Sequence, residues 1–223
     1  MATAGHTCTL KTTGSAVAVT GEATTTSAPY AVFTITNAAR RVMDPATAIT
    51  VKKNGVTQTG SLYLVNYLFG QITFLSPLVV TDVVTVDYAY LPLLSLAETR
   101  SFELSLSSSM LETTVMDAST ANRSRVAGLR DASGSIGTLD NLLTDLDPGA
   151  GAVRVWQEWF DAGENRVVEV SFPGGQKFRA FARLPDVKLS SGFDALVEGS
   201  INWSADARTG VGRTDGVAFG IGY

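Results

Sequence analysis

The chain has 223 residues, of which 45% are hydrophobic, so it is long enough for one large β domain or two small ones with a packed core. Its net charge of −4 argues against tight binding of DNA or RNA through a basic surface, because neutralising phosphates requires clustered lysine and arginine. The acidity is uneven. Residues 1–95 carry five basic and four acidic groups, whereas residues 96–223 carry twelve and seventeen.

The first half of the chain is expected to be almost entirely β-strand. Asn54-Gly55 lies between two extended runs and predicts a tight hairpin, because both turn positions need positive φ. Residues 54–81 carry no charge, but polar residues and Pro77 interrupt them, so two buried strands around a turn at Gly70 are a better interpretation than a membrane span. The strands expected here are 15–20, 30–36, the hairpin 48–59, 61–69, 71–75 and 83–90.

The second half is expected to begin at a boundary within 90–98, where Pro92 interrupts any strand. One helix is expected at 138–147, because its leucines recur at helical spacing and Pro148-Gly149 follows. Residues 207–223 are glycine-rich and predict a C-terminal arm rather than a core element. The remaining strands are expected at 99–107, 110–116, 129–137, 152–160, 165–172, 176–184 and 194–204.

No catalytic, cofactor or metal site is predicted. Cys8 is the single cysteine, so no internal disulfide or zinc cluster is expected, and the N-terminus lacks a signal-peptide pattern, which predicts synthesis in the cytoplasm. A base–nucleophile pair of His6 with Cys8 has no third group to orient it. Four carboxylates near one hairpin could flank a glycosidic bond, but solvated charge is the default interpretation: Glu158, Asp161, Glu164 and Glu169.

Two features suggest a function. The stretch "SFELSLS" (101–107) alternates Phe102, Leu104 and Leu106 with serine and glutamate, which predicts a strand with one wholly polar face. The stretch "VMDASTANRSRVAGLRDASGSI" (115–136) predicts a long polar loop, which is either a solvated hairpin connection or an interface element.

The succession "YLPL", "SFELSLSSSMLETTVMD", "RSRVAGLRDASGSI", "LDNLLTDL" and "ALVEGSINWSAD" resembles the major tail (tail tube) proteins of long-tailed bacteriophages. The resemblance covers residues 96–206, and its most telling piece is "LETTVMD" followed by "RVAGLRDASGSI". It implies a mainly β fold, an antiparallel β-sandwich or barrel with one short flanking helix, preceded by an N-terminal β-rich extension at 1–95 and followed by the arm at 207–223.

The resemblance also implies a structural, non-enzymatic virion protein located in the tail. Its subunits join edge to edge into rings, usually hexamers, which stack into a hollow tube through which DNA passes without specific binding. The loop 116–128 would reach a neighbouring ring. The residues expected to face the channel are Ser101, Glu103, Ser105, Ser107, Asp131, Ser133 and Ser135, and those expected between subunits or rings are Glu112, Asp117, Arg123, Arg125 and Arg130.

By the same resemblance, the partners are further copies of the chain, a tape measure protein, a tail terminator and tail-tip proteins, with no membrane insertion. The alternative that the residues leave open is a β-sandwich binding or decoration module on a virion surface, which explains the β content and the lack of catalytic groups equally well.

Overall fold

The computed structural model describes residues 9–95, 99–112, 125–140, 159–163, 165–172, 174–191, 197–206 and 219–222. Contacts divide the chain into two units. The first unit comprises residues 1–97, 164–182 and 206–223, and the second comprises residues 98–163 and 183–205. Residues 164–182 and 206–223 thus group with the N-terminal part of the chain, and an independent domain at 1–95 stays a prediction.

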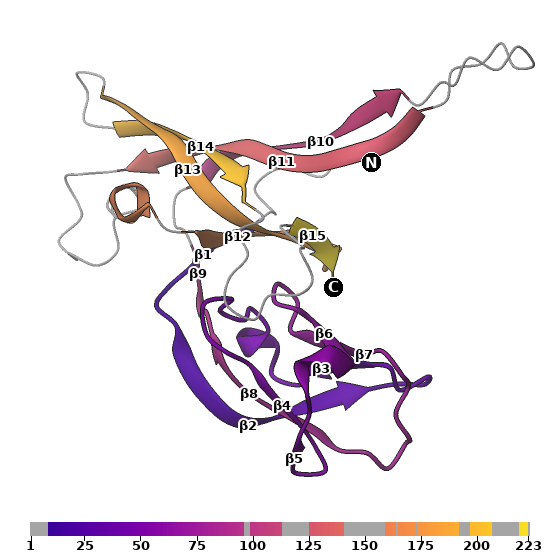
Figure 1. Ribbon diagram of the computed structural model, residues 1–223. Helices are drawn as coiled ribbons and strands as arrows, with labels where there is room; N and C mark the ends of the chain where they lie inside the picture. The colour runs from indigo at the N-terminus through magenta and orange to yellow at the C-terminus, as the bar shows by residue number, and fades with distance from the viewer. Residues whose placement is uncertain are drawn as a thin grey trace, which may run out of the picture. The chain divides into compact units, whose positions relative to one another are not determined.

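The N-terminal part of the first unit holds seven strands in the order β5-β4-β8-β2-β3-β7-β6, all paired antiparallel (Figure 1). The expected hairpin and turn are confirmed, because Asn54, Gly55 and Gly70 all have positive φ. The bounds are β2 Val17–Thr26, β3 Val32–Ile35, β4 Thr50–Lys53, β5 Val56–Thr57, β6 Tyr63–Asn66, β7 Gln71–Phe74 and β8 Val84–Tyr90, with short 3-10 helices η2 Ala38–Arg40 and η3 Gly60–Leu62.

A second set of strands in the first unit pairs in the order β13-β12-β1-β9, with β15 also paired to β13. Val167 and Phe181 from this set belong to the same buried hydrophobic cluster as Phe33, Tyr67 and Ile72 from the N-terminal strands. The bounds are β1 Thr9–Thr13, β9 Leu93–Ser95, β12 Arg166–Ser171, β13 Lys177–Ser191 and β15 Phe219–Gly222.

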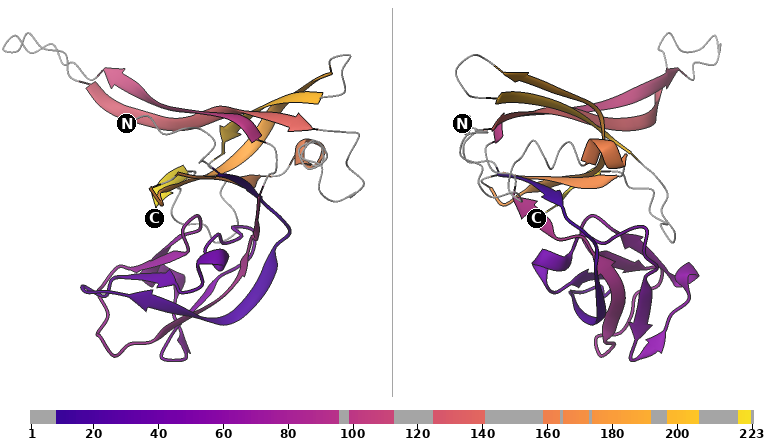
Figure 2. Two further views of the ribbon diagram at one scale, coloured as in Figure 1. Left: turned by 180° about the vertical axis from the view of Figure 1, so that it is seen from behind. Right: turned by 90° about the vertical axis from the view of Figure 1, so that its left-hand side faces the viewer.

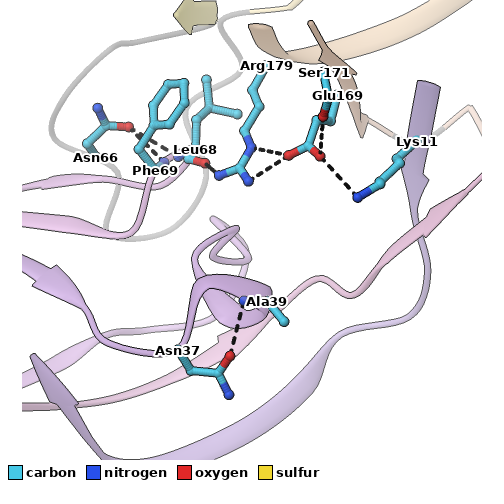
Figure 3. Close-up of polar contacts among 9 residues, drawn as sticks. All are labelled: Lys11, Asn37, Ala39, Asn66, Leu68, Phe69, Glu169, Ser171 and Arg179. Carbon is cyan, nitrogen blue, oxygen red and sulfur yellow. Dashed lines mark hydrogen bonds and ion pairs between the residues drawn. The ribbon is translucent and has the colours of Figure 1, made fainter. Parts of the chain in front are cut away.

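A buried ion pair between β12 and β13 lies inside the first unit, and a hydrogen bond from its arginine connects it to the N-terminal strands (Figure 3). The Arg179 guanidinium donates through Nε to Glu169 Oε2 at 2.7 Å and through Nη1 to the carbonyl oxygen of Leu68 at 2.6 Å. It also lies 5.2 Å from the centroid of the Phe69 ring, while Lys11 Nζ lies 3.5 Å from the other carboxylate oxygen of Glu169. Burial raises the pKa of Glu169, but the attraction and hydrogen bonds of Arg179 outweigh this and hold that pKa below its ordinary value.

The second unit is built on the order β10-β11-β14-β13, to which β13 contributes its residues 183–191. β10 (Thr99–Glu112) and β11 (Arg125–Asp140) pair antiparallel and lie side by side as a long ribbon in every view (Figures 1 and 2). β14 (Val197–Ala205) pairs with residues 133–140 of β11. A helical turn covers 159–162, within which Trp159 is buried.

The structure corrects several expectations in the second half of the chain. The helix expected at 138–147 is wrong for residues 138–140, because β11 continues through them and pairs with β14. Cross-strand hydrogen bonds override the local helical spacing of the leucines there. Residues 141–147 lie outside the described residues. The expected strands 99–107 and 110–116 are one strand as far as Glu112, with a register shift between Ser108 and Met110. Of the strand expected at 152–160, the structure describes only residues 159 and 160, and these are helical.

Three further expectations at chain ends and boundaries need correction. Residues 219–222 of the expected arm form β15, in which Gly220 and Gly222 pack against the Phe69 ring. β9 starts directly after Pro92, and β1 was not expected at all. Glu169 is not solvated but fully buried in its ion pair.

The expectation of a mainly antiparallel β protein is confirmed. Among the described residues, no helix has the length and apolar character needed to cross a membrane.

Candidate functional site

One face of the β10–β11–β14 sheet is polar along all three strands. In register across the strands, Glu103 faces Ser135, which faces Asn202. The neighbouring rows repeat this chemistry, because odd-numbered residues of β10 and β11 align with even-numbered residues of β14. The rows are Ser101–Gly137–Ser200, Ser105–Ser133–Ser204 and Ser107–Asp131. Every one of these residues is exposed or partly exposed.

The opposite face of the same three strands is apolar. Phe102 aligns with Ile136 and Ile201, and the last two are fully buried. Trp203 is also buried, and its ring stacks on Phe102 at a centroid distance of 6.3 Å and an interplanar angle of 11°. Because successive side chains of a strand point to opposite faces, this packing fixes the polar residues on the other side.

The polar face carries only negative charge in the rows just described. Glu103 and Asp131 are its ionisable residues, and the others are serine, asparagine and glycine. The Ser135 hydroxyl donates to Glu103 Oε2 at 3.4 Å, and Asp131 Oδ1 accepts from the Ala132 N–H at 2.8 Å. Such a surface repels phosphate and offers it no cation to bind.

β10 is an edge strand of this sheet. Among the residues that the structure describes, it pairs with β11 alone, and β11 residues before 133 have no β14 partner. Leu106, in the apolar series of β10, is exposed beside this open edge, whereas Phe102 and Leu104 are partly buried. An exposed edge with an apolar residue beside it is a surface suited to pairing with another chain.

Gly134 is required for the close approach of Trp203 to the sheet. A Cβ at this position would overlap the carbonyl oxygen of Glu103 and would lie 2.8 Å from Cε2 and Cζ2 of the indole. We therefore expect Gly134→Ala to destabilise the protein by about 1–3 kcal/mol, as overpacking of a core typically does, measured as a fall in Tm.

Gly137→Ala is the matched control for that substitution. A Cβ there would meet the Ser101 hydroxyl, which can rotate away, so the fall in Tm should be clearly smaller. Equal effects of the two substitutions would show that the indole does not depend on Gly134.

The residues expected to face the channel align in one polar series, whereas the described residues of the expected loop set, Glu112, Arg125 and Arg130, are in strands. Arg125 and Arg130 belong to β11, where they align in register with Glu112 and Ser108 of β10. The loop interpretation of 116–128 is wrong for residues 125–128, which are strand. Arg123 and Asp117 lie outside the described residues.

The strand expected at 194–204 is confirmed as β14, but its contribution to the polar face was not predicted. Ser200, Asn202 and Ser204 alternate with Ile201 and Trp203 in the same two-residue period that identified 101–107. That alternation was a usable signal.

The glycosidase alternative gains no support from the placement of its carboxylates. Glu169 is engaged by Arg179, Asp161 lies in the helical turn, and Glu158 and Glu164 lie outside the described residues. Within the part of the chain that the structure describes, no three His, Cys, Asp or Glu side chains gather to hold a metal ion.

Comparison of the sequence with models of known protein families gives no match, and comparison with curated proteins gives none either. The fold is similar to a solved structure described as the virion of a native gene transfer agent (GTA) particle, with 14% identity and a TM-score of 0.45 over 59% of this chain and 89% of that one. It is also similar to one described as the tail of an empty GTA particle with C6 symmetry, with 16% identity and a TM-score of 0.45 over 59% of this chain and 87% of that one.

Proposed function

We propose that the protein is a structural virion protein that assembles into stacked rings, expected to be hexamers, which form a hollow tail tube for the passage of DNA. The polar face of the β10–β11–β14 sheet lines the channel, and the edge of β10 pairs with a neighbouring subunit. The observation that carries this proposal is the series of hydroxyl, amide and carboxylate groups on one face of three strands, in which Gly137 is the one residue of these rows without a polar side chain.

The chemistry of that face suits a channel better than a binding surface. A specific nucleic-acid site needs arginine or lysine at the phosphates and aromatic or amide groups at the bases, and the described rows offer neither cations nor aromatic rings. DNA is repelled weakly from all sides by Glu103 and Asp131, so it stays mobile. The tape measure, terminator and tail-tip proteins are the further partners that this role requires.

The edge of β10 supports assembly between copies. Soluble proteins normally protect sheet edges, because exposed ones recruit other chains. In a ring, the same pairing becomes the intended contact, and rotation by a fixed angle closes it.

Negative-stain microscopy of the purified protein tests the proposal. Rings or tubes are expected. Compact, unassembled particles at high protein concentration would contradict it and would favour the decoration module instead.

A lysine on the polar face is expected to obstruct DNA. Glu103→Lys should leave tubes intact in micrographs, since residue 103 is exposed. It should reduce DNA delivery roughly tenfold or more, which is the lower end of the effect that a focused surface charge has on a charged ligand. The defect should lessen as salt rises, because salt screens exposed charges.

Ser108→Lys is the control, because Ser108 is exposed but aligns with Arg130 outside the polar rows. Particles with either lysine are counted by microscopy and titrated for delivery. If the two lysines impair delivery equally, residue 103 does not face the channel.

A further inference from the structure

The turn between β4 and β5 holds the one Asn-Gly pair of the sequence, Asn54-Gly55. An asparagine followed by glycine is prone to lose its side-chain amide, because glycine has no Cβ to hinder attack by its own backbone nitrogen on the asparagine side chain. Both residues are exposed, and a Cβ at Gly55 would meet no atom within 4 Å. Among the described residues, the Gly55 N–H meets no hydrogen-bond acceptor. The attacking nitrogen is therefore accessible.

The modification needs only water and atoms of this chain. The backbone nitrogen of Gly55 loses its proton and attacks Cγ of Asn54, the Cγ–Nδ2 bond breaks, and Nδ2 leaves with a proton as ammonia. A cyclic succinimide results. Water then adds its hydroxyl to either ring carbonyl carbon and its proton to the ring nitrogen, so the ring opens to aspartate or isoaspartate. No group is oxidised or reduced.

The turn at residues 79–83 holds the Asn54 side chain by both ends. The Val83 N–H donates to Asn54 Oδ1 at 2.8 Å, and Asn54 Nδ2 donates to Asp82 Oδ1 at 2.9 Å. The Asn54 N–H also donates to the Val83 carbonyl at 2.8 Å. These partners fix which end of the amide is which, since an N–H only donates and a carboxylate only accepts. The amide therefore cannot rotate freely without losing both of its hydrogen bonds.

Asp82 is itself held in place, so it is a firm anchor for the amide. Its side chain is only 6% exposed, and its Oδ2 lies 2.9 Å from Lys53 Nζ and accepts from the Val79 N–H at 3.0 Å. The hydrogen bond with Lys53 lowers the pKa of Asp82 more than burial raises it, and Val79 and Asn54 lower it further. The carboxylate consequently stays ionised at neutral pH, where it accepts from Nδ2 and has no proton to give to a leaving nitrogen.

We propose that Asn54 is a site of spontaneous deamidation whose rate is set by the clamp of Asp82 and Val83. The closed clamp keeps the amide intact, and its opening leaves Cγ free to meet the Gly55 nitrogen. Reactions between neighbouring groups depend steeply on geometry, and a misplacement of about 1 Å can cost roughly 10²-fold in rate. The inference is independent of the proposed function, because it concerns only residues of the N-terminal strands and their turns.

Deamidation should also open the clamp for good. A carboxylate at position 54 has no N–H to donate, so it would face Asp82 as a like charge where a hydrogen bond of 2.9 Å now lies. Isoaspartate would lengthen the main chain within a two-residue turn whose residues both have positive φ. The β4–β5 hairpin and the turn at 79–83 should therefore separate once the site has reacted.

The experiment follows deamidation of the full chain by mass spectrometry of its peptides, during incubation at mildly alkaline pH. Asp82→Ala should deamidate at position 54 roughly tenfold faster than the folded wild type or more, and the wild type unfolded in urea should be faster still. Lys53→Met is the matched control, because it removes the ion pair with Asp82 but leaves the hydrogen bond from Asn54, so its rate should stay near that of the wild type.

An internal control is present in every digest. Asn37 is exposed too, but Ala38 follows it, so position 37 should remain unreacted while position 54 changes. Equal rates at position 54 in the folded wild type and in folded Asp82→Ala would overturn the proposal. If Asp82→Ala does not fold, the wild type decides alone: equal rates with and without urea, or no reaction in urea, would overturn it.

A pair of substitutions tests the opening of the clamp. Asn54→Asp imitates the main charge change and should lower the Tm. Adding Asp82→Asn supplies an amide donor for the new carboxylate and should recover part of that loss. An unchanged Tm for Asn54→Asp, or no recovery in the double variant, would overturn the claim that deamidation opens the clamp.

Discussion

Arg179→Met is expected to destabilise the folded protein by about 3–5 kcal/mol at neutral pH, because removing one member of a buried ion pair leaves the other charge uncompensated. Glu169 is fully buried and Arg179 nearly so, and the substitution also removes the hydrogen bond to the Leu68 carbonyl. Lys11 remains 3.5 Å from Glu169 but is partly exposed, so it replaces little of the lost interaction. Urea unfolding measures the effect.

The pH dependence gives this prediction a specific signature. In the wild type, the pKa of Glu169 is lowered, so the pair stabilises fully above the unfolded pKa of about 4.3, and this stabilisation is lost as pH falls through the lower folded pKa. Without Arg179, burial is opposed only by the weaker attraction of Lys177 and Lys11, so we expect the pKa of Glu169 to rise and the folded variant to take up a proton more readily than its unfolded chain. The difference in free energy of unfolding between the wild type and Arg179→Met should therefore shrink as pH falls from 7 towards the acid range.

Two controls accompany the Arg179 experiment. The double substitution Glu169→Gln with Arg179→Met leaves no buried charge, and it should recover most of the lost stability with little pH dependence. Lys188→Met removes a cation from an exposed pair with Asp186 and should cost less than about 1 kcal/mol. A large, pH-independent loss for Arg179→Met would show that its packing on Phe69 matters more than its charge.

Trp203→Ala is expected to cost about 3–5 kcal/mol, the usual range for removing a large buried aromatic side chain. Trp203 is almost fully buried, stacks on Phe102 and covers Gly134. Because its packing fixes the apolar side of the sheet, the polar side should lose its order as well, and we expect assembly to fail along with stability.

Thermal unfolding and microscopy measure the effect of Trp203→Ala. Phe160→Ala is the control, because Phe160 is an aromatic residue of the same unit but is half exposed. The Tm of Trp203→Phe should lie between those of the wild type and the alanine variant. A stable Trp203→Ala protein that still forms tubes would contradict the role given to the apolar face.

Local signals predicted much of the fold. Asn54-Gly55 predicted its hairpin because the turn needs two positive φ values, and both residues have them. The alternation at 101–107 predicted which residues share a face because a strand has a fixed two-residue period, and the register confirms that Ser101, Glu103, Ser105 and Ser107 form one series.

What could not be predicted depends on partners distant in the sequence. Leucine spacing indicated a helix from 138, but pairing with β14, about 60 residues later, keeps 138–140 in a strand. Glu169 looked like a solvated charge, and only the fold brings Arg179 and the Leu68 carbonyl to it. β15 is short and glycine-rich, and its strand conformation follows from β13 and Phe69 rather than from its own propensity.

The register shift between Ser108 and Met110 has a consequence for which substitutions the chain tolerates. From Ser108 to Met110 the strand β10 advances two residues, while β11 advances three, from Arg130 to Ala127. Before the shift, odd-numbered residues of β11 such as Asp131 align with odd-numbered residues of β10. After the shift they align with even-numbered residues of β10, so that Arg125 aligns with Glu112. The surplus residue thus keeps Arg125 out of the odd-numbered series of β10 that carries Glu103. Related chains should be free to vary the identities of residues 127–130 but not their number, since a deletion of one residue would exchange the two series.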